Sequence, residues 1–435
     1  MTRPRAGETQ RRGPDSHGLR RLLVRAGLGL AVALVLLGVV EGVARLVLGS
    51  PPPPPTIRRY HDFFDPLLEI RDGLVCPVFQ GKDAIAPFAL HKRPGRPRVL
   101  FVGGSSVRSG SGLGPESEFP ALVERALRDR GVDVEVLNFG RAGFDTGDIR
   151  LLLERARPLE PDVVVCYAGH NDIGNLTFHE RYGNVRSALA ARVRIALQQT
   201  RTFLLLERAL VRPSRAFGLR TVARPADFPR VEPGRIRMGE SLFRRNLDRI
   251  ARDVLESQAG LVLATVIADE VGCAPSAPSC PDLIPPGSGA LVDGVWRLDL
   301  DPPGLTLEAV RAGLARDPDC ADLLYLEGRL LGPGDPKGVE AFRQARDRDP
   351  VPIRATPGIL EAIRDVARER GATLVDLDAL ARREGGGIPP QGWFTDQMHL
   401  SPLGHRRVAE ALVDPVAQAL PPGERRGGID AAGPR

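Results

Sequence analysis

Residues 98–106 read RVLFVGGSS. A short apolar run with β-branched residues, ended by two glycines and two serines, predicts a buried β-strand whose carboxyl end makes a tight turn. Four more runs of this kind follow, VDVEVLNFG at 132–140, DVVVCYAG at 162–169, GLVLATVI at 260–267 and TLVDLDAL at 373–380. The five runs predict the strands of one sheet.

Helical patterns separate or follow these runs. FPALVERALRDRG at 119–131 and ILEAIRDVARERG at 359–371 both end in glycine, and an apolar helix is expected over 404–420. Apolar strands alternating with helices are typical of a parallel sheet covered on both faces, so the predicted fold class is α/β. In open sheets of this class the site lies beyond the carboxyl ends of the strands.

The first polar turn at such an end presents Ser105, which follows paired glycines. An ordinary Gly/Ser turn is the alternative interpretation. The turn is not the nucleophile elbow of α/β-hydrolases, since the chain contains no G-x-S-x-G. It is not a dinucleotide-binding or P-loop fingerprint either. A hydroxyl at this position is a candidate nucleophile.

Three further segments supply groups that an ester-cleaving serine needs. NFGRAG at 138–143 offers the backbone N–H of Gly143, and AGHND at 168–172 offers the carboxamide of Asn171. Both are suitable donors for an oxyanion, although Asn171 also fits a simple turn former. In FTDQMH at 394–399, Asp396 and His399 lie three residues apart and can serve as orienting acid and base, or only as helix-capping residues.

Taken together, GGSS, NFGRAG, AGHND and TDQMH resemble, in order, the sequence blocks of the SGNH hydrolase family, the GDSL-like esterases and lipases. The resemblance covers about half of the chain. It implies a flavodoxin-like three-layer α/β/α fold with a five-stranded parallel sheet. Gly104 and Ser106 depart from the GDSL signature by replacing its Asp and Leu, which makes Ser106 a rival nucleophile.

The resemblance also implies a catalytic triad of Ser105, Asp396 and His399. Its oxyanion hole would consist of the Ser105 N–H, Gly143 and Asn171. We therefore expect a serine esterase that acts on an ester or an acylated glycan and needs neither a cofactor nor a metal. Two alternatives stay open at this stage, an O-acyltransferase of the same fold acting on a cell-envelope glycan and a non-catalytic envelope interaction protein.

A membrane segment is predicted at 22–48, LLVRAGLGLAVALVLLGVVEGVARLVL, which is long enough to cross about 30 Å of hydrocarbon. Glu41 and Arg45 lie one helical turn apart in it and are expected to pair. The basic tail at 1–21 predicts a cytoplasmic N-terminus and a periplasmic or extracytoplasmic catalytic domain. A cleaved signal peptide is the competing interpretation.

The formal charge of +6 does not indicate a nucleic-acid partner. Seven of the 60 basic residues and two of the 54 acidic residues lie in 1–25, so the rest of the chain holds 53 basic and 52 acidic residues. The excess positive charge is therefore a property of the N-terminal tail.

The five cysteines are too few for a disulfide scaffold and show no zinc spacing. Cys273 and Cys280 bracket a Pro/Ser/Ala loop, and outside the cytosol a disulfide between them is plausible. A pair of Cys76 with Cys320 is also open.

The chain is expected to divide into a tail at 1–21, the membrane helix at 22–48, a Pro-rich lead-in at 49–96, the hydrolase domain at 97–420 and a C-terminal tail at 421–435. Two insertions interrupt the hydrolase domain, a largely helical one at 173–258 and one at 271–353. Within the second, 321–331 and 338–350 are spaced like one tetratricopeptide unit. A single unit cannot bury its own face, so it should pack on the hydrolase domain. A protein partner for it is the weaker expectation.

Overall fold

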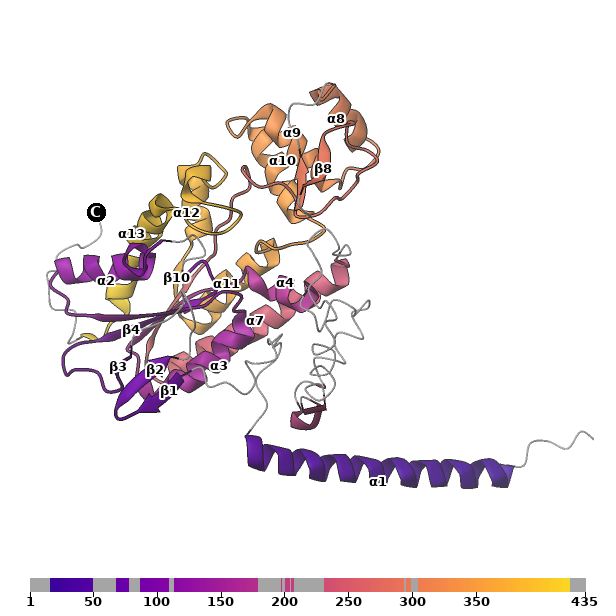
Figure 1. The fold of residues 1–435 in the computed structure, drawn as a ribbon, viewed down its shortest axis with the longest axis vertical. Coiled ribbons are helices and arrows are strands. Elements are labelled where there is room, and N and C mark those ends of the chain that lie inside the picture. The colour runs from indigo at the N-terminus through magenta and orange to yellow at the C-terminus, as the bar shows by residue number, and fades with distance from the viewer. Residues whose placement is uncertain are drawn as a thin grey trace, which may run out of the picture.

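The computed structural model describes residues 16–49, 68–77, 87–108, 113–178, 197, 200–203, 205–206, 231–292, 295–298 and 304–422. Its centre is a five-stranded parallel sheet with the strand order β10-β7-β6-β4-β5 (Figure 1). The strands are β4 (Arg98–Gly103), β5 (Glu135–Gly140), β6 (Val163–Tyr167), β7 (Gly260–Ala264) and β10 (Thr373–Val375). In chain order this is 2-1-3-4-5, the flavodoxin-like arrangement, and the predicted fold class is confirmed.

The middle strands are the most deeply buried part of the molecule. All residues of β4 and β6 are buried, and Val99 of β4 pairs with Val136 of β5 and Val163 of β6. Strands with neighbours on both edges and helices on both faces have no solvent-facing side. Their sequences are therefore apolar without alternation.

Helices cover both faces of the sheet (Figure 1). On one face lie α2 (Phe119–Asp129) and α13 (Pro402–Ala419), and on the other lie α3 (Thr146–Ala156), α7 (Pro233–Glu256) and α11 (Pro357–Arg370). The predicted glycine stop of α11 is present at Gly371, whose φ of +68° is the left-handed conformation of a helix C-cap. The result is the predicted three-layer arrangement.

One predicted strand was wrong in its second half. TLVDLDAL was expected to be extended over 373–380, but β10 ends at Val375 and helix α12 (Leu377–Glu384) begins directly after it. The Asp376 side chain accepts a hydrogen bond from the backbone N–H of Ala379, which is an N-cap. The capping carboxylate thus starts a helix within a run whose apolar pattern predicts a strand.

A small antiparallel sheet precedes the main one. It consists of β1 (Leu68–Arg71), β2 (Leu74–Pro77) and β3 (Phe88–Ala89). Asp72 and Gly73 connect β1 to β2 with φ angles of +52° and +74°, as the two-residue turns of hairpins require.

The second insertion forms a separate lobe beside the sheet, orange in Figure 1. It contains the hairpin β8 (Gly289–Val292) and β9 (Val295–Leu298), followed by α8 (Leu307–Leu314), α9 (Ala321–Leu331) and α10 (Pro336–Asp347). The Phe342 ring packs 5.7 Å from that of Tyr325 and shares a buried cluster with Ile388 of the α/β domain. The lobe therefore packs on the α/β domain, as predicted.

Buried charges join this lobe to the α/β domain. The Glu270 carboxylate, which follows β7, accepts hydrogen bonds from Arg346 of α10 and Arg382 of α12. Burial opposes its ionisation, but the two guanidinium groups outweigh burial and hold the pKa of Glu270 below its usual value. Because a buried charge is costly without a partner, these ion pairs favour the observed packing of the lobe on the α/β domain.

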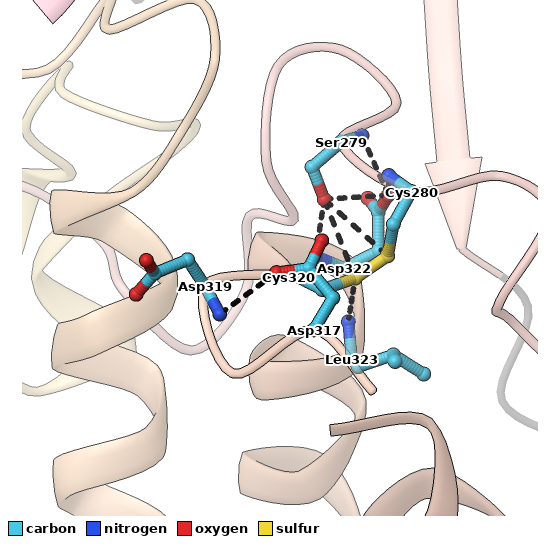
Figure 2. Close-up of a disulfide and its surroundings, with 7 residues drawn as sticks. All are labelled: Ser279, Cys280, Asp317, Asp319, Cys320, Asp322 and Leu323. Carbon is cyan, nitrogen blue, oxygen red and sulfur yellow. Dashed lines mark hydrogen bonds between the residues drawn. A yellow bond between two sulfur atoms is a disulfide. The ribbon is translucent and has the colours of Figure 1, made fainter. Parts of the chain in front are cut away.

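The predicted disulfide between Cys273 and Cys280 was wrong, because Cys280 has another partner. Cys280 is bonded to Cys320 at the start of α9 (Figure 2). Cys273 is a free thiol. Figure 2 also shows Asp322, whose Oδ2 atom accepts hydrogen bonds from the N–H and hydroxyl of Ser279. This carboxylate holds the loop so that Cys280 meets Cys320.

The N-terminal helix α1 spans Ser16–Leu48. Its stretch Gly27–Leu48 has 22 residues, a mean hydropathy of 2.3 and a buried share of 6%. By length and composition it is able to cross a membrane. The predicted pair within it is present, since Arg45 Nε lies 2.6 Å from Glu41 Oε1.

Parts of the predicted division fall outside the described residues. They are most of the N-terminal tail, the proline run at 51–55, the centre of the 173–258 insertion and the end of the C-terminal tail.

Candidate active site

The site lies where the strand order reverses, between β4 and β6. The chain continues from β4 in one direction to β5 and later returns to β6 on the other side of β4. The turns after these two adjacent parallel strands carry Ser105 and Asn171. A crevice at this place in an open α/β sheet is the usual ligand site.

Ser105, His399 and Asp396 form a continuous chain of hydrogen bonds. His399 Nε2 lies 2.7 Å from Ser105 Oγ, and His399 Nδ1 lies 2.6 Å from Asp396 Oδ2. Ser105 is partly exposed. A hydroxyl in contact with an imidazole whose other nitrogen meets a carboxylate is the arrangement of an activated serine.

The Asp396 carboxylate also organises its own loop. Its Oδ1 atom accepts hydrogen bonds from the backbone N–H groups of Met398 and His399, at 3.0 and 2.9 Å. Burial opposes ionisation, but the His399 ring and these two amides outweigh burial and lower the pKa of Asp396 to about 2. Asp396 is therefore ionised at neutral pH and available to hold the His399 imidazole.

Ser106 faces a different partner. Its hydroxyl donates a hydrogen bond of 3.1 Å to the carbonyl of Met398, and the residue is only 5% exposed. This bond ties the turn after β4 to the loop that carries His399. Ser106 thus ties the turn that carries Ser105 to the loop that carries His399, whereas the Ser105 hydroxyl contacts the His399 imidazole.

Asn171 lies directly beside the backbone that precedes Ser105. A Cβ atom added to Gly104 would come within 2.6 Å of Asn171 Nδ2, so only glycine leaves room for this carboxamide. The same nitrogen donates to the Phe144 carbonyl at 2.9 Å, which fixes the orientation of the amide. Because a carboxamide nitrogen has two hydrogens, one N–H is left for a substrate oxygen.

Gly143 is held in a conformation that suits glycine. Its φ angle is +76°, and its carbonyl accepts a hydrogen bond of 2.8 Å from Asn175 Nδ2. Among the described residues, the backbone N–H groups of Ser105 and Gly143 donate no hydrogen bond. Both N–H groups therefore remain available as donors.

Two positioning residues escaped the sequence analysis. Asn175 holds Gly143 from the first turns of α4 (Asn171–Phe178). Its spacing of four residues from Asn171, which places both on one helix face, was the available signal. Asn138, within β5, donates to the carbonyl of Val107 at 3.2 Å and supports the loop that follows Ser105.

The buried histidines near the site have structural roles. His170 Nδ1 accepts a hydrogen bond from the Ala355 N–H, and His405 Nδ1 accepts one from the Phe119 N–H, both at 3.1 Å. Burial lowers the pKa of His170 to about 3 and that of His405 to about 4. Both are neutral at physiological pH and distinct from the His399 base.

In the part of the chain that the structure describes, one cluster has metal-ligand spacing, Cys280, Cys320 and Asp322. Its two sulfur atoms are bonded to each other, and it lies in the inserted lobe rather than beside the triad.

Comparison with known proteins gives structural resemblance only. No family model and no curated protein matches the chain. Solved structures that it resembles include the acetyl xylan esterase AlAXEase, with 14% identity, a TM-score of 0.34, and coverage of 73% of this chain and 99% of that one. A lipase/acylhydrolase from Enterococcus faecalis has 13% identity, a TM-score of 0.36, and coverage of 75% and 98%.

A lipolytic protein of the G-D-S-L family from Desulfitobacterium hafniense has 10% identity, a TM-score of 0.34, and coverage of 74% and 99%. With scores and identities this low, the activity of the present chain is inferred from its own strand order and side-chain geometry.

Proposed function

We propose that this protein is a membrane-anchored serine ester hydrolase of the SGNH type. The observation that carries the proposal is the hydrogen-bond chain from Ser105 Oγ through the His399 ring to Asp396, at 2.7 and 2.6 Å. A non-catalytic protein has no need to keep these groups aligned at the carboxyl edge of the sheet.

Acylation follows from the geometry. Ser105 Oγ attacks the carbonyl carbon of an ester, and its proton passes to His399 Nε2. Asp396 holds Nδ1–H, so Nε2 is the free acceptor before attack, and its negative charge stabilises the imidazolium afterwards. When the tetrahedral intermediate collapses, the C–O bond to the alcohol breaks and the His399 proton goes to the departing oxygen.

The negative charge that develops on the carbonyl oxygen needs donors fixed in advance. The N–H groups of Ser105 and Gly143 and the second N–H of Asn171 supply them. Gly104, Asn175 and the Phe144 carbonyl hold these donors in place. Because the donors are already oriented, little reorganisation is needed as the charge forms.

Deacylation reuses the same groups. Water takes the place of the departed alcohol, His399 removes one of its protons, and the hydroxide oxygen adds to the acyl carbon. Collapse of the second tetrahedral intermediate breaks the bond to Ser105 Oγ, and His399 returns the proton to the serine. The products are a carboxylic acid and the free enzyme.

The proposed membrane location of the enzyme rests on helix α1. The stretch Gly27–Leu48 is long and apolar enough to cross a membrane, and the rest of the chain buries little of it. The Arg-rich tail before the helix favours a cytoplasmic N-terminus. The catalytic domain then lies on the periplasmic or outer side.

The test is hydrolysis of p-nitrophenyl acetate by the full-length chain in detergent. Release of nitrophenol by the unsubstituted chain, and its loss in Ser105→Ala, is the expected result. Equal rates in the two proteins would contradict the proposal.

A further inference from the structure

Glu41 of α1 is bonded to a segment distant in sequence. Its Oε1 atom accepts a hydrogen bond from the backbone N–H of Arg201, and its Oε2 atom accepts one each from the N–H and the hydroxyl of Thr202, all at 2.9 Å. With the Arg45 contact, this carboxylate has four donors. The sequence predicts only the Arg45 partner.

Arg201 extends the contact to the end of the helix. Its guanidinium group donates to the carbonyls of Leu48 and Gly49, at 2.8 and 2.7 Å. The last carbonyls of a helix lack partners within the helix and favour a cation. The segment around Arg201 therefore runs alongside the last two turns of α1.

This contact lies within the predicted membrane segment. Glu41 is seven residues before Leu48, a distance of about 10 Å along the helix. Carboxylates are costly inside a membrane unless they are paired or bonded. Here the partners of Glu41 are Arg45 and, from the distant segment, Arg201 and Thr202, which must reach the same depth.

The same region exposes apolar side chains. Leu205 and Leu206 are 39% and 56% exposed, and Leu46 and Val47 of α1 are 87% and 75% exposed. Residues 201–203 and 205–206 are helical. An apolar helical surface that adjoins a membrane helix fits the boundary between headgroups and acyl chains, which such elements enter by about 5–10 Å.

We propose that residues 200–203 and 205–206 are a second membrane contact, inserted into the interfacial layer of the bilayer next to α1 and held there by Glu41. This inference rests on the proposed membrane anchor. Its partner is lipid, with Leu205 and Leu206 as the side chains that enter. The catalytic domain is thereby attached to the bilayer at two places, which restricts how the Ser105 site can turn relative to the surface.

The test uses full-length protein in lipid vesicles and quenching of tryptophan by bromine-labelled acyl chains. Three variants each add one tryptophan, Leu206→Trp in the proposed contact, Leu36→Trp in α1 and Leu330→Trp in α9. Leu330 is 40% exposed, which matches Leu205, but it lies in the inserted lobe. Emission is measured as the gain over the unsubstituted chain, which has two tryptophans.

The proposal expects the bromolipid to remove most of the added emission from Leu206→Trp and Leu36→Trp and to leave that of Leu330→Trp. Quenching of Leu36→Trp alone would overturn the second contact and leave the anchor intact. No quenching of Leu36→Trp would instead remove the anchor on which the inference rests.

The role of Glu41 is tested in the Leu206→Trp background. Replacing Thr202 by Val removes the hydroxyl donor, and Glu41→Ala removes the acceptor of all four bonds. Quenching at position 206 should fall in Glu41→Ala, and less in Thr202→Val, while Leu36→Trp stays quenched in both. Unchanged quenching at 206 in Glu41→Ala would show that Glu41 does not hold the segment.

Discussion

The Nε2 atom of His399 lies 2.7 Å from the Oγ atom of Ser105, although 294 residues separate the two. The sheet explains the contact. Ser105 follows strand β4, and the loop that carries His399 is tied to the turn after β4 by the bond between Ser106 and the Met398 carbonyl.

Gly104→Ala should impair turnover through Asn171. The new Cβ would lie 2.6 Å from Asn171 Nδ2, which is too close for an unchanged position. We expect a clear fall in kcat for p-nitrophenyl acetate with a cooperative thermal transition retained. The matched control is Gly392→Ala, where the added Cβ meets nothing within 4 Å. Equal kcat values for the two variants would mean that Asn171 does not serve at the oxyanion.

Asn171→Ala removes the proposed side-chain donor itself. Loss of one oxyanion donor costs about 10²–10³ in kcat, and we expect a loss of that size from steady-state kinetics. Asn246→Ala is a useful control, because this buried amide donates to Thr146 Oγ1 rather than to the site. A change in KM alone for Asn171→Ala would argue for substrate binding instead of stabilisation of the transition state.

Asp396 predicts a specific dependence of stability on pH. Its pKa in the folded protein is about 2, below the ordinary value of 3.8. A carboxyl group whose pKa is lower in the folded than in the unfolded state stabilises the fold at pH values above its unfolded-state pKa. This contribution is lost as the pH falls through the folded-state pKa. The window is therefore about pH 4 down to about pH 2. Solvent screening reduces the contribution of Asp396 to the stability, because the side chain is 49% exposed.

Urea unfolding of the unsubstituted chain and Asp396→Asn tests this window. The difference between their free energies of unfolding should be constant from about pH 6 to about pH 4 and should shrink below about pH 4. A difference that grows on acidification would contradict the assignment of an ionised, hydrogen-bonded Asp396.

The disulfide makes a prediction about the inserted lobe. Cys280 and Cys320 close a loop with a sequence separation of 40 residues, for which chain entropy alone gives about 4 kcal/mol of stabilisation. Cys320→Ser should lower the free energy of unfolding by up to this amount in denaturant titrations, whereas Cys273→Ser should change it little. A larger loss of stability in Cys273→Ser than in Cys320→Ser would instead support the pairing of Cys273 with Cys280 that the sequence suggested.

The sequence predicted the sheet because burial on both faces leaves a readable pattern. β4 and β6 are entirely buried, and their runs are apolar without interruption. The resemblance of the sequence blocks implied a triad of Ser105, Asp396 and His399, and the structure brings these three side chains within hydrogen-bond distance. The end of β10 was missed, since the capping bond of Asp376 to Ala379 decides it and is not visible in apolar periodicity.

Contacts between distant segments could not be predicted in this way. Cys273 is much closer to Cys280 in the sequence than Cys320 is. Only the packing of the loop on α9 makes Cys320 the partner of Cys280. The bonds of Glu41 to Arg201 and Thr202 join residues about 160 positions apart. Such pairings depend on tertiary structure, and one sequence gives no pattern for them.

The most direct test of the central claim is covalent labelling by a fluorophosphonate, followed by mass spectrometry of the modified peptide. Such probes react with a serine only where a base activates its hydroxyl. Our account predicts one phosphonylated residue, Ser105, no labelling of Ser105→Ala or His399→Ala, and retained labelling of Ser106→Ala. Modification of Ser106, or labelling that persists in Ser105→Ala, would contradict it.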